Sequence, residues 1–393
     1  MTDLIRHEPF FGKYMFSHQG DLYLVDGPIE PTEGSLVTTL DICPQNGLSV
    51  PAKVQIQVTN RCNLKCPHCY VASGAPLAGE LTDLEIKSFL QACQQTGVLQ
   101  IQWSGGDPFV RKGFLALVQY AHSLGFEQDI LTNGVALGRN SDLASELWKY
   151  VHAVQVSMDG YGENFDIWVG KHAWDPVLKS IASLVATKPE YGRVSVATTL
   201  DRKNLTELGT IGETLSDLGV SAWLLARQVR NGRSLISEDE ADELLFSSYS
   251  LLQEMRERNA KLPSRVLHPF DKGTQNEEGA ILPVEWITEP AARTFLYVSA
   301  NGDVYPFPYF DGYAEWASGN IREASLLDLW HSEPFNLLRA ATRSSTGCGG
   351  CKRICQLWSR WFNYGRKSNI CEPPINHPTC TSRTWTASSA VIP

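Results

Sequence analysis

From residue 52 onward, short apolar runs alternate along the chain with longer stretches whose apolar residues recur at helical spacing. Apolar runs bounded by turn residues favour β-strands, and the longer periodic stretches favour amphipathic helices. The pattern predicts strands at Val54–Val58, Leu99–Trp103, Gln128–Leu131, Ala153–Ser157, Val194–Thr199 and Ala222–Leu225. It predicts helices over residues 82–95, 112–124, 142–150, 175–187, 205–218 and 238–258. Six β/α units in series indicate an α/β fold with a parallel sheet, curved into a partial (β/α)6 TIM-like barrel.

The two ends of the chain have a different pattern. Residues 10–48 are expected to form short strands and turns, with a hairpin around Gly20 followed by a Pro/Gly-rich linker. After about residue 260 the alternation stops, and a connecting segment over 261–283 leads to a hairpin with an Asn-Gly turn at 301–302. A helix near 324–340 and a tail rich in Cys and Trp follow. We therefore expect three parts, which are a β-rich extension over 1–50, the barrel over 51–260 and a small Cys-rich domain over 261–393.

Composition narrows the class of protein. The 393 residues are 43% hydrophobic and 20% charged, which is typical of a globular protein. The formal net charge of −9 disfavours nonspecific binding of nucleic acid. The first residues contain no apolar core of secretory-signal length, and no stretch approaches the roughly 20 apolar residues of a membrane helix. We therefore expect a cytoplasmic protein, off the membrane, whose ten cysteines serve metal or redox chemistry and not disulfides.

The cysteines are distributed unevenly. Three lie at 62–69 and five at 348–380. Cys93 stands in a helical pattern and is expected to be a small core residue, because free Cys packs as a hydrophobe. Cys43 receives no role.

The first group of cysteines directly follows the first barrel strand, in TNRCNLKCPHCY. Cys62, Cys66 and Cys69 have the spacing C-x3-C-x2-C. Thiolates are natural ligands of iron–sulfur clusters, and three of them can hold three irons of a cubane and leave the fourth open to S-adenosylmethionine (SAM). Three other interpretations stay open, which are a zinc site with His68 as fourth ligand, a reactive thiol pair, and chance clustering.

This spacing, together with the motifs at later strand ends, resembles the radical SAM superfamily. His68 stands in the aromatic position of the C-x3-C-x-Φ-C signature. The second strand ends in WSGGDP, where Gly105–Pro108 resemble the family's GGEP motif with Asp for Glu. The later strands end in LTNG, VSMDG, TTLDRKN and LLARQVRNGR. The resemblance covers roughly residues 50–230, and in such barrels the chemistry lies at the carboxyl ends of the strands.

The resemblance implies a [4Fe–4S] cluster that binds SAM and, once reduced by a donor such as flavodoxin or ferredoxin, releases a 5′-deoxyadenosyl radical. It places His68 near the adenine, Asp107 and backbone groups at the methionyl ammonium, and Arg227 at the SAM carboxylate or the substrate. The implied SAM contacts are His68, Tyr70, Gly105, Gly106, Asp107, Pro108, Asn133, Ser157, Asp159, Thr199 and Arg227. Taken singly, GGDP is more often a turn, Asp159 could be an N-cap, and Arg227 could be a surface ion pair.

The second group of cysteines lies in the tail CGGCKRICQLWSRWFNYGRKSNICEPPINHPTC. With the segments NGDVYPFPYF and SGNIREASLLDLW, it resembles a SPASM domain, whose typical members bind two auxiliary [4Fe–4S] clusters. Phe307 and Glu289 stand where cysteines of the nearer auxiliary cluster are usual. The resemblance thus implies one auxiliary [4Fe–4S] cluster, with the ligands Cys348, Cys351, Cys355 and either Cys371 or Cys380. A zinc site is the alternative.

Three functional hypotheses follow. The SPASM-like tail favours peptide maturation, in which the radical takes hydrogen from a ribosomally made precursor peptide to allow a crosslink, an epimerisation or another modification. The N-terminal strands could bind peptide by edge addition, and a separate leader-binding protein is a candidate partner. The second hypothesis is the same radical acting on a small molecule such as an amino sugar, nucleoside or amino acid. The third is a noncatalytic iron–sulfur or zinc protein. No proton-transfer residue is assigned from the sequence.

Overall fold

The computed structural model describes residues 48–170, 172–257 and 291–344, and the strand residues 4–8, 12–16, 22–25, 36–39 and 266–267. Its main feature is a nine-stranded sheet. The strands lie in the order β11 (Val266–Leu267), β10 (Ala222–Ala226), β9 (Arg193–Thr199), β8 (Ala153–Ser157), β7 (Glu127–Thr132), β6 (Gln100–Ser104), β5 (Lys53–Gln57), β12 (Phe295–Val298) and β13 (Val304–Tyr305). Neighbouring strands are parallel except for the antiparallel pair β12 and β13.

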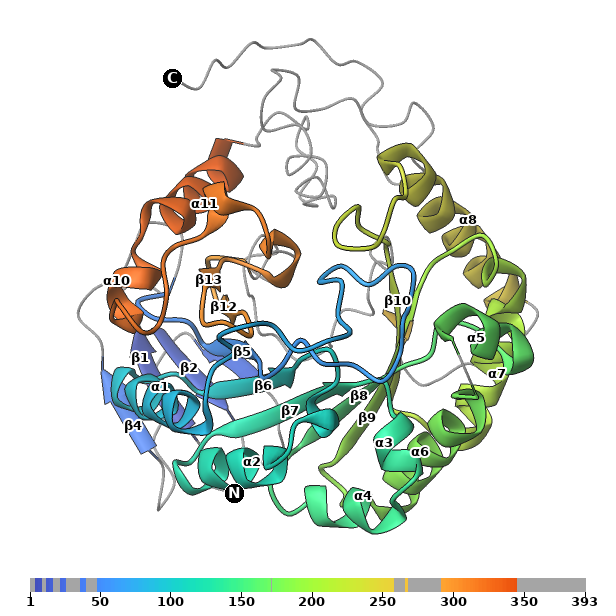
Figure 1. Cartoon of the computed structure of the whole chain (residues 1–393), viewed down its shortest axis with the longest axis horizontal. Helices are drawn as coiled ribbons and strands as arrows, with labels where there is room; N and C mark the ends of the chain where they lie inside the picture. Colours follow the sequence, from blue (N-terminus) through green and yellow to red (C-terminus); the bar gives the residue numbers. More distant parts are fainter. Residues whose placement is uncertain are drawn as a thin grey trace.

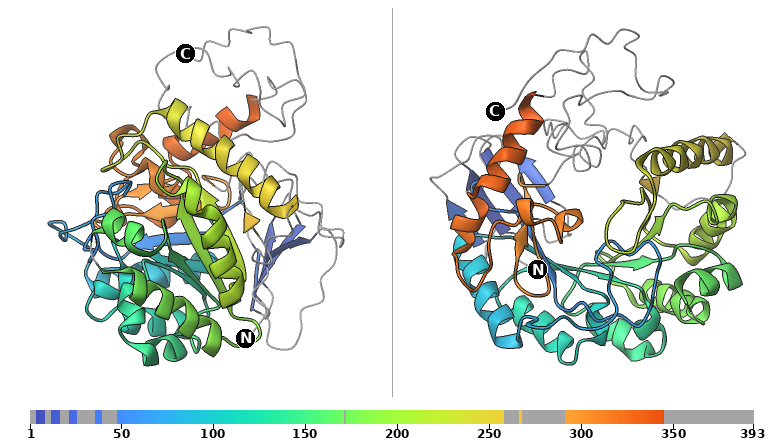
Figure 2. Two further views of the ribbon diagram at one scale, coloured as in Figure 1. Left: turned by 90° about the vertical axis from the view of Figure 1, so that its right-hand side faces the viewer. Right: turned by 45° about the horizontal axis from the view of Figure 1, so that its top comes forward.

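Helices cover the outer side of this sheet, which curves into an incomplete barrel (Figures 1 and 2). They are α1 (Asp83–Thr96), α2 (Phe114–Ser123), α3 (Val135–Gly138), α4 (Ser141–Leu147), α5 (Gly162–Val169), α6 (Trp174–Thr187), α7 (Leu208–Leu218) and α8 (Glu238–Glu257). The six predicted strands and six predicted helices are confirmed, with ends that differ by a few residues, whereas the short helices α3 and α5 were not predicted. Cys93 is fully buried in α1, as expected of a core residue. No helix in the described part of the chain is both long and apolar enough to cross a bilayer.

Alternation along the strands separates an outer and an inner face of the sheet. Residues such as Val54, Ile56 and Trp103 are fully buried against the helices. The alternate positions of β8, β9 and β10 face away from the helices and are partly exposed. The inner face of the barrel is therefore reached by solvent along these strands.

The N-terminal strands form a second sheet in the order β3 (Leu22–Val25), β2 (Gly12–Phe16), β1 (Leu4–Glu8) and β4 (Leu36–Thr39). The predicted hairpin around Gly20 is confirmed by the antiparallel pairing of β2 with β3. The Pro/Gly-rich linker predicted after this hairpin lies outside the described residues, and beyond it β4 pairs in parallel with β1. Its sequence LVTT is rich in β-branched residues, which favour a strand despite the Pro and Gly nearby.

The C-terminal hairpin joins the barrel sheet, because β12 pairs in parallel with β5. Gly302 in the predicted Asn-Gly turn has a positive φ of 93°. The single helix expected near 324–340 is instead two helices, α10 (Leu326–Trp330) and α11 (Glu333–Ser344), which are separated at His331 and Ser332. The division of the chain into three domains stays a prediction.

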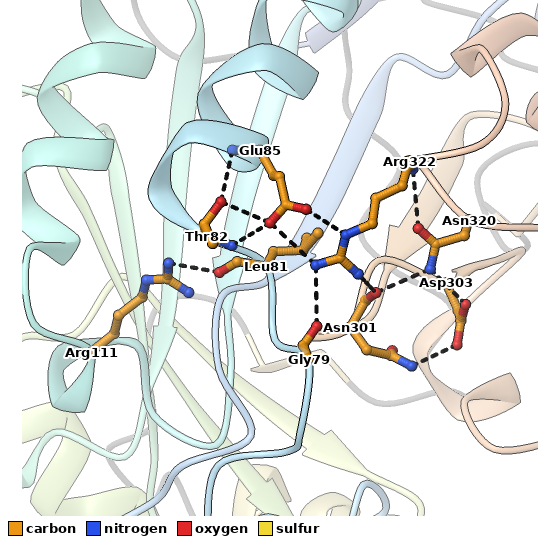
Figure 3. A network of polar contacts seen from close by, with 9 residues as sticks. All are labelled: Gly79, Leu81, Thr82, Glu85, Arg111, Asn301, Asp303, Asn320 and Arg322. Atoms are coloured by element: carbon orange, nitrogen blue, oxygen red, sulfur yellow. Dashed lines mark hydrogen bonds and ion pairs between the residues drawn. The ribbon is translucent and has the colours of Figure 1, made fainter.

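A polar network ties this hairpin to the start of α1 (Figure 3). The guanidinium of Arg322 donates to both carboxylate oxygens of Glu85, at 2.5 and 3.2 Å. It also donates to the carbonyl oxygens of Asn301 and Gly79, at 2.7 and 3.1 Å. Glu85 completes a capping box with Thr82 at the N-terminus of α1. One arginine thus joins the barrel, the cap of its first helix and the C-terminal hairpin.

Replacing Arg322 with Ala is expected to loosen the hairpin against α1. Hydrogen–deuterium exchange should rise at residues 79–85 and 299–304, whereas Lys149→Ala, which removes another exposed ion pair, should leave these segments unchanged. Hydrogen bonds from Arg322, and after them those from the backbone and side chain of Thr82, lower the pKa of Glu85 from its ordinary value of 4.5 to about 2. A lowered folded pKa contributes stability above pH 4.5 that is lost as the pH falls toward 2. The native chain and the Arg322→Ala variant should therefore show the same exchange near pH 2. Equal exchange at pH 7 would contradict this role.

Candidate active site

Cys62, Cys66 and Cys69 lie in a loop that follows β5 at the carboxyl edge of the barrel sheet. We call residues 59–74 the cluster loop. It packs directly on the end of β6, because the backbone N–H of Gly106 donates to the Thr59 carbonyl at 2.7 Å. The loop is therefore supported by the end of β6, which carries the GGDP motif.

The three thiols are free and half-buried. The Sγ of Cys62 accepts a hydrogen bond from the backbone N–H of Leu64 at 3.4 Å, and that of Cys69 accepts one from Ser73 at 3.3 Å. Such donors stabilise sulfur that carries negative charge. Burial raises the pKa of the Cys62 and Cys66 thiols, so the thiolates need a bound cation. The residues present fit an iron–sulfur cluster.

The zinc interpretation loses its fourth ligand in this structure. Trp168 Nε1 donates to His68 Nδ1 at 3.0 Å, and His68 Nε2 lies 3.2 Å from Asp159 Oδ2. Within the described ranges, no three His, Cys, Asp or Glu side chains are grouped so that they could hold one metal ion. The thiolates of a cubane bind different irons and stand further apart than the ligands of a single ion, so this arrangement favours a cluster over zinc.

The GGDP motif, Gly105–Pro108, packs against the cluster loop and supports it. A Cβ on Gly106 would lie 2.3 Å from the Arg61 carbonyl oxygen, so only glycine allows this close approach to the cluster loop. Asp107 is fully buried, and its carboxylate accepts hydrogen bonds from Thr132 Oγ1, Asn133 N and Phe109 N at 2.7, 2.8 and 3.0 Å. Burial raises the pKa of Asp107. Both carboxylate oxygens are thus engaged within the protein, and the contact of Asp107 and the neighbouring backbone groups with the SAM ammonium stays a prediction.

The other predicted contacts lie at successive strand ends. Asn133 Nδ2 donates to Asn63 Oδ1 at 2.8 Å and lies 3.6 Å from Cys62 Sγ. Ser157 ends β8 and Thr199 ends β9, and the Thr199 N–H donates to Asp159 Oδ1 at 2.7 Å. Because Asp159 also meets His68, it links two strand ends to the cluster loop. The candidate residues from β6 to β9 are therefore brought together at one edge of the sheet.

The positive charge of Arg227 is paired with carboxylates of α8. Its guanidinium is 3% exposed and donates to Asp242 Oδ1 at 2.8 Å and Glu238 Oε2 at 2.7 Å, both on α8. It also donates to the Gln228 carbonyl. Burial beside α8 thus gives this arginine two carboxylate partners, and its predicted contact with SAM stays a prediction.

Replacing Arg227 with Met is expected to lower the free energy of unfolding by about 3 kcal/mol, because Glu238 and Asp242 would be left without their shared cation. Urea denaturation of the cluster-free protein measures this change. If Arg227 instead binds SAM, the variant should unfold as the native chain does and show a raised KM for SAM.

Sequence reasoning missed the arginine that does reach the cluster loop. Arg233 Nε donates to the Cys66 carbonyl at 2.9 Å, and its backbone N–H donates to the Cys69 carbonyl at 2.9 Å. The signal was present in the motif LLARQVRNGR, which contains both Arg227 and Arg233 after the sixth strand. Trp168 was missed as well, since nothing in the sequence of α5 relates it to His68.

Aromatic residues connect the cluster loop to the C-terminal hairpin. Tyr70, which follows Cys69, packs edge-on against Tyr309 with ring centroids 5.2 Å apart. Phe307, at the position where a cysteine is usual, packs against Tyr309 and Phe295 at 5.2 Å each. Burial raises the pKa of Tyr70 and Tyr309. Cys43, Glu289 and the predicted auxiliary ligands Cys348, Cys351, Cys355, Cys371 and Cys380 lie outside the described residues.

Comparison with known proteins agrees with this site. Residues 56–210 match the Radical SAM superfamily, and residues 290–353 match SPASM, an iron–sulfur cluster-binding domain. The chain is 29% identical over 329 residues to an AdoMet-dependent heme synthase of Methanosarcina barkeri, covering 78% of this chain and 90% of that relative. It is 26% identical over 315 residues to the mycofactocin maturase MftC of Mycobacterium tuberculosis, covering 78% and 77%.

Solved structures show the same fold. Streptococcus suis SuiB bound to S-adenosylmethionine matches with a TM-score of 0.61 and 18% identity, covering 79% of this chain and 73% of SuiB. The enzyme anSMEcpe with bound AdoMet matches with a TM-score of 0.58 and 16% identity, covering 77% and 88%. The family matches over residues 56–210 and 290–353 identify the chain as a radical SAM enzyme. Within that superfamily it belongs with the enzymes that carry a SPASM domain, so its cofactors are a SAM-binding [4Fe–4S] cluster, SAM and auxiliary iron–sulfur.

Proposed function

We propose that this enzyme modifies a ribosomally made precursor peptide, and that Cys62, Cys66 and Cys69 hold its SAM-binding cluster. The observation that carries the peptide proposal is the inner face of the barrel beside the cluster loop. It presents amides and hydroxyls in place of the branched apolar residues that fill closed barrels. The partly exposed inward positions are Gln102, Gln155, Ser157 and Ser195, and below them Gln55, Gln57 and Ser104 are buried and hydrogen-bonded within the protein.

Amide and hydroxyl side chains suit a peptide, because a backbone offers alternating N–H donors and carbonyl acceptors. Lys53 is the cation on the inner side of β5, and its ammonium is paired with Asp129 at 2.7 Å. The relative MftC, named as a mycofactocin maturase, supports the same substrate class. None of these inward side chains is an unpaired cation. The inner face of the barrel therefore favours the uncharged backbone of a peptide over a substrate with several negative charges.

The protein's own groups have distinct parts in this reaction. When bound, the cluster and SAM supply a carbon-centred radical that can remove a hydrogen atom from the substrate. Gly105 and Gly106 bring backbone close to the cofactor, and the stacked rings of His68 and Trp168 form a flat wall beside the cluster loop, with centroids 5.6 Å apart and planes 17° apart. Asp159 holds the imidazole from the other side. A flavodoxin or ferredoxin would deliver the electron, and a separate protein would present the leader segment.

A tetrapyrrole is the second candidate substrate. The curated relatives include AdoMet-dependent heme synthases and a pre-heme d1 synthase at 27–29% identity. Such a substrate would be a small molecule, as the alternative hypothesis from the sequence supposes. Propionate groups call for arginine or lysine, and the inward residues of β5 to β9 named above are mostly uncharged.

The experiment that separates these candidates uses the reconstituted enzyme with a chemical reductant and SAM. We expect the product of a neighbouring short peptide gene to stimulate 5′-deoxyadenosine formation and to change in mass. Iron-coproporphyrin III should do neither. Stimulation by the tetrapyrrole alone would overturn the peptide proposal but leave the cluster site intact.

A further inference from the structure

The loop after β10 contacts two distant parts of the chain. We call residues 230–233 the bridging loop. On one side it meets the cluster loop, where the guanidinium of Arg233 donates from Nε to the Cys66 carbonyl at 2.9 Å and from Nη1 to the Ser73 carbonyl. The backbone N–H of Arg233 donates to the Cys69 carbonyl at 2.9 Å. One residue therefore holds three carbonyls that span the segment from Cys66 to Ser73.

On its other side the bridging loop holds the C-terminal hairpin. Asn231 Nδ2 donates to the carbonyl oxygens of Tyr309 and Asp311, at 3.1 and 3.0 Å. The Tyr313 hydroxyl lies 3.4 Å from the Arg230 carbonyl. These contacts join segments almost 80 residues apart in sequence, as the separation of 78 between Asn231 and Tyr309 shows. Together with the packing of Tyr70 against Tyr309, the bridging loop thus links the cluster loop to the chain just after Phe307.

Gly232 allows this close packing. Its φ is +59°, and a Cβ there would lie 2.3 Å from the Cys69 carbonyl oxygen and 2.5 Å from that of Tyr70. Both obstacles are backbone atoms, so no rotation of a side chain could relieve the clash. The two loops are in direct contact at this point.

The charge of Arg233 has a consequence beyond packing. Within the described part of the chain, its guanidinium bonds go to backbone carbonyls and none to a carboxylate. A half-buried positive charge thus stands beside Cys66, where a thiolate-bound cluster would carry negative charge. Hydrogen bonds and net charge around the sulfurs are what tune such clusters.

We propose that Arg233 is a positioning residue for the SAM-binding cluster, and that Asn231 couples the cluster loop to the C-terminal hairpin. This inference rests on the proposed cluster site at Cys62, Cys66 and Cys69.

The test compares Arg233→Ala, Arg233→Lys and Asn231→Ala with the matched control Arg202→Ala, whose guanidinium pairs with Glu240 and Glu243 away from the cluster loop. Hydrogen–deuterium exchange of the cluster-free full chain should rise at residues 66–73 in both Arg233 variants. Lysine keeps the charge but cannot bond in the planar fork, so the rise should be similar. Asn231→Ala should raise exchange at residues 305–313, and Arg202→Ala should change neither segment.

The reconstituted proteins supply the second readout. Arg233→Ala should alter the EPR spectrum of the reduced cluster and lower SAM cleavage by about 10- to 100-fold, the usual cost of losing support around metal ligands. Arg233→Lys should retain a spectrum closer to that of the native enzyme. Native exchange and native EPR in Arg233→Ala would overturn the inference. A native chain that holds no cluster at all would instead refute the proposed function, while the exchange experiment would still decide the role of the bridging loop.

Discussion

Replacing Cys62, Cys66 or Cys69 with Ala is expected to remove the SAM-binding cluster and reduce 5′-deoxyadenosine formation to the background rate. Each thiol is the ligand of one iron in the proposed cubane. Among the described residues, the neighbouring His68 is not available to replace it, since Trp168 and Asp159 engage its imidazole. Iron and sulfide analysis with chromatography of the SAM products measures both effects.

The matched control for this prediction is Cys93→Ala. Cys93 is fully buried in α1, where burial raises its pKa and keeps the thiol inert. Its replacement should leave the iron content and SAM cleavage of the enzyme unchanged. Retained cleavage in any of the three cluster-loop variants would show that the cluster is held elsewhere. Loss in Cys93→Ala as well would point to a general folding defect.

The barrel was predictable because its information is local. Each strand is a short apolar run, and each helix has its own apolar period, so the order of elements follows directly from the chain. The addition of β12 beside β5 was not predictable, since the two strands are more than 200 residues apart and their pairing depends on the closed tertiary structure.

Part of the candidate site could likewise be predicted from the sequence and part could not. The motif positions at the ends of β6 to β9 were identified by their resemblance to radical SAM motifs, each following a predicted strand, and parallel strands bring their carboxyl ends to one edge. The choice between Arg227 and Arg233 could not be made from the sequence, since both follow β10 within a few residues. Only the structure shows that α8 supplies carboxylates to Arg227 and leaves Arg233 to the cluster loop.

Replacing Gly106 with Ala is expected to displace the cluster loop and lower SAM cleavage by about 100-fold, because misplacing a reacting group by roughly 1 Å has effects of this size. The added Cβ would meet the Arg61 and Asn60 carbonyl oxygens at 2.3 and 2.6 Å. These are backbone atoms of the cluster loop, so the clash must be relieved by moving the loop itself or the GGDP segment. Iron content and SAM-induced change in the EPR spectrum report the displacement.

Gly209 provides the control for this substitution. It lies in α7 with no atom within 4 Å of a built Cβ, so Gly209→Ala should leave iron content and cleavage unchanged and stabilise the helix slightly. If Gly106→Ala binds SAM and cleaves it at the native rate, the GGDP segment cannot be a tight support of the cluster loop. If it keeps its cluster but loses the EPR response to SAM, the segment acts on the cofactor through its backbone, since the carboxylate of Asp107 is already taken up by Thr132, Asn133 and Phe109.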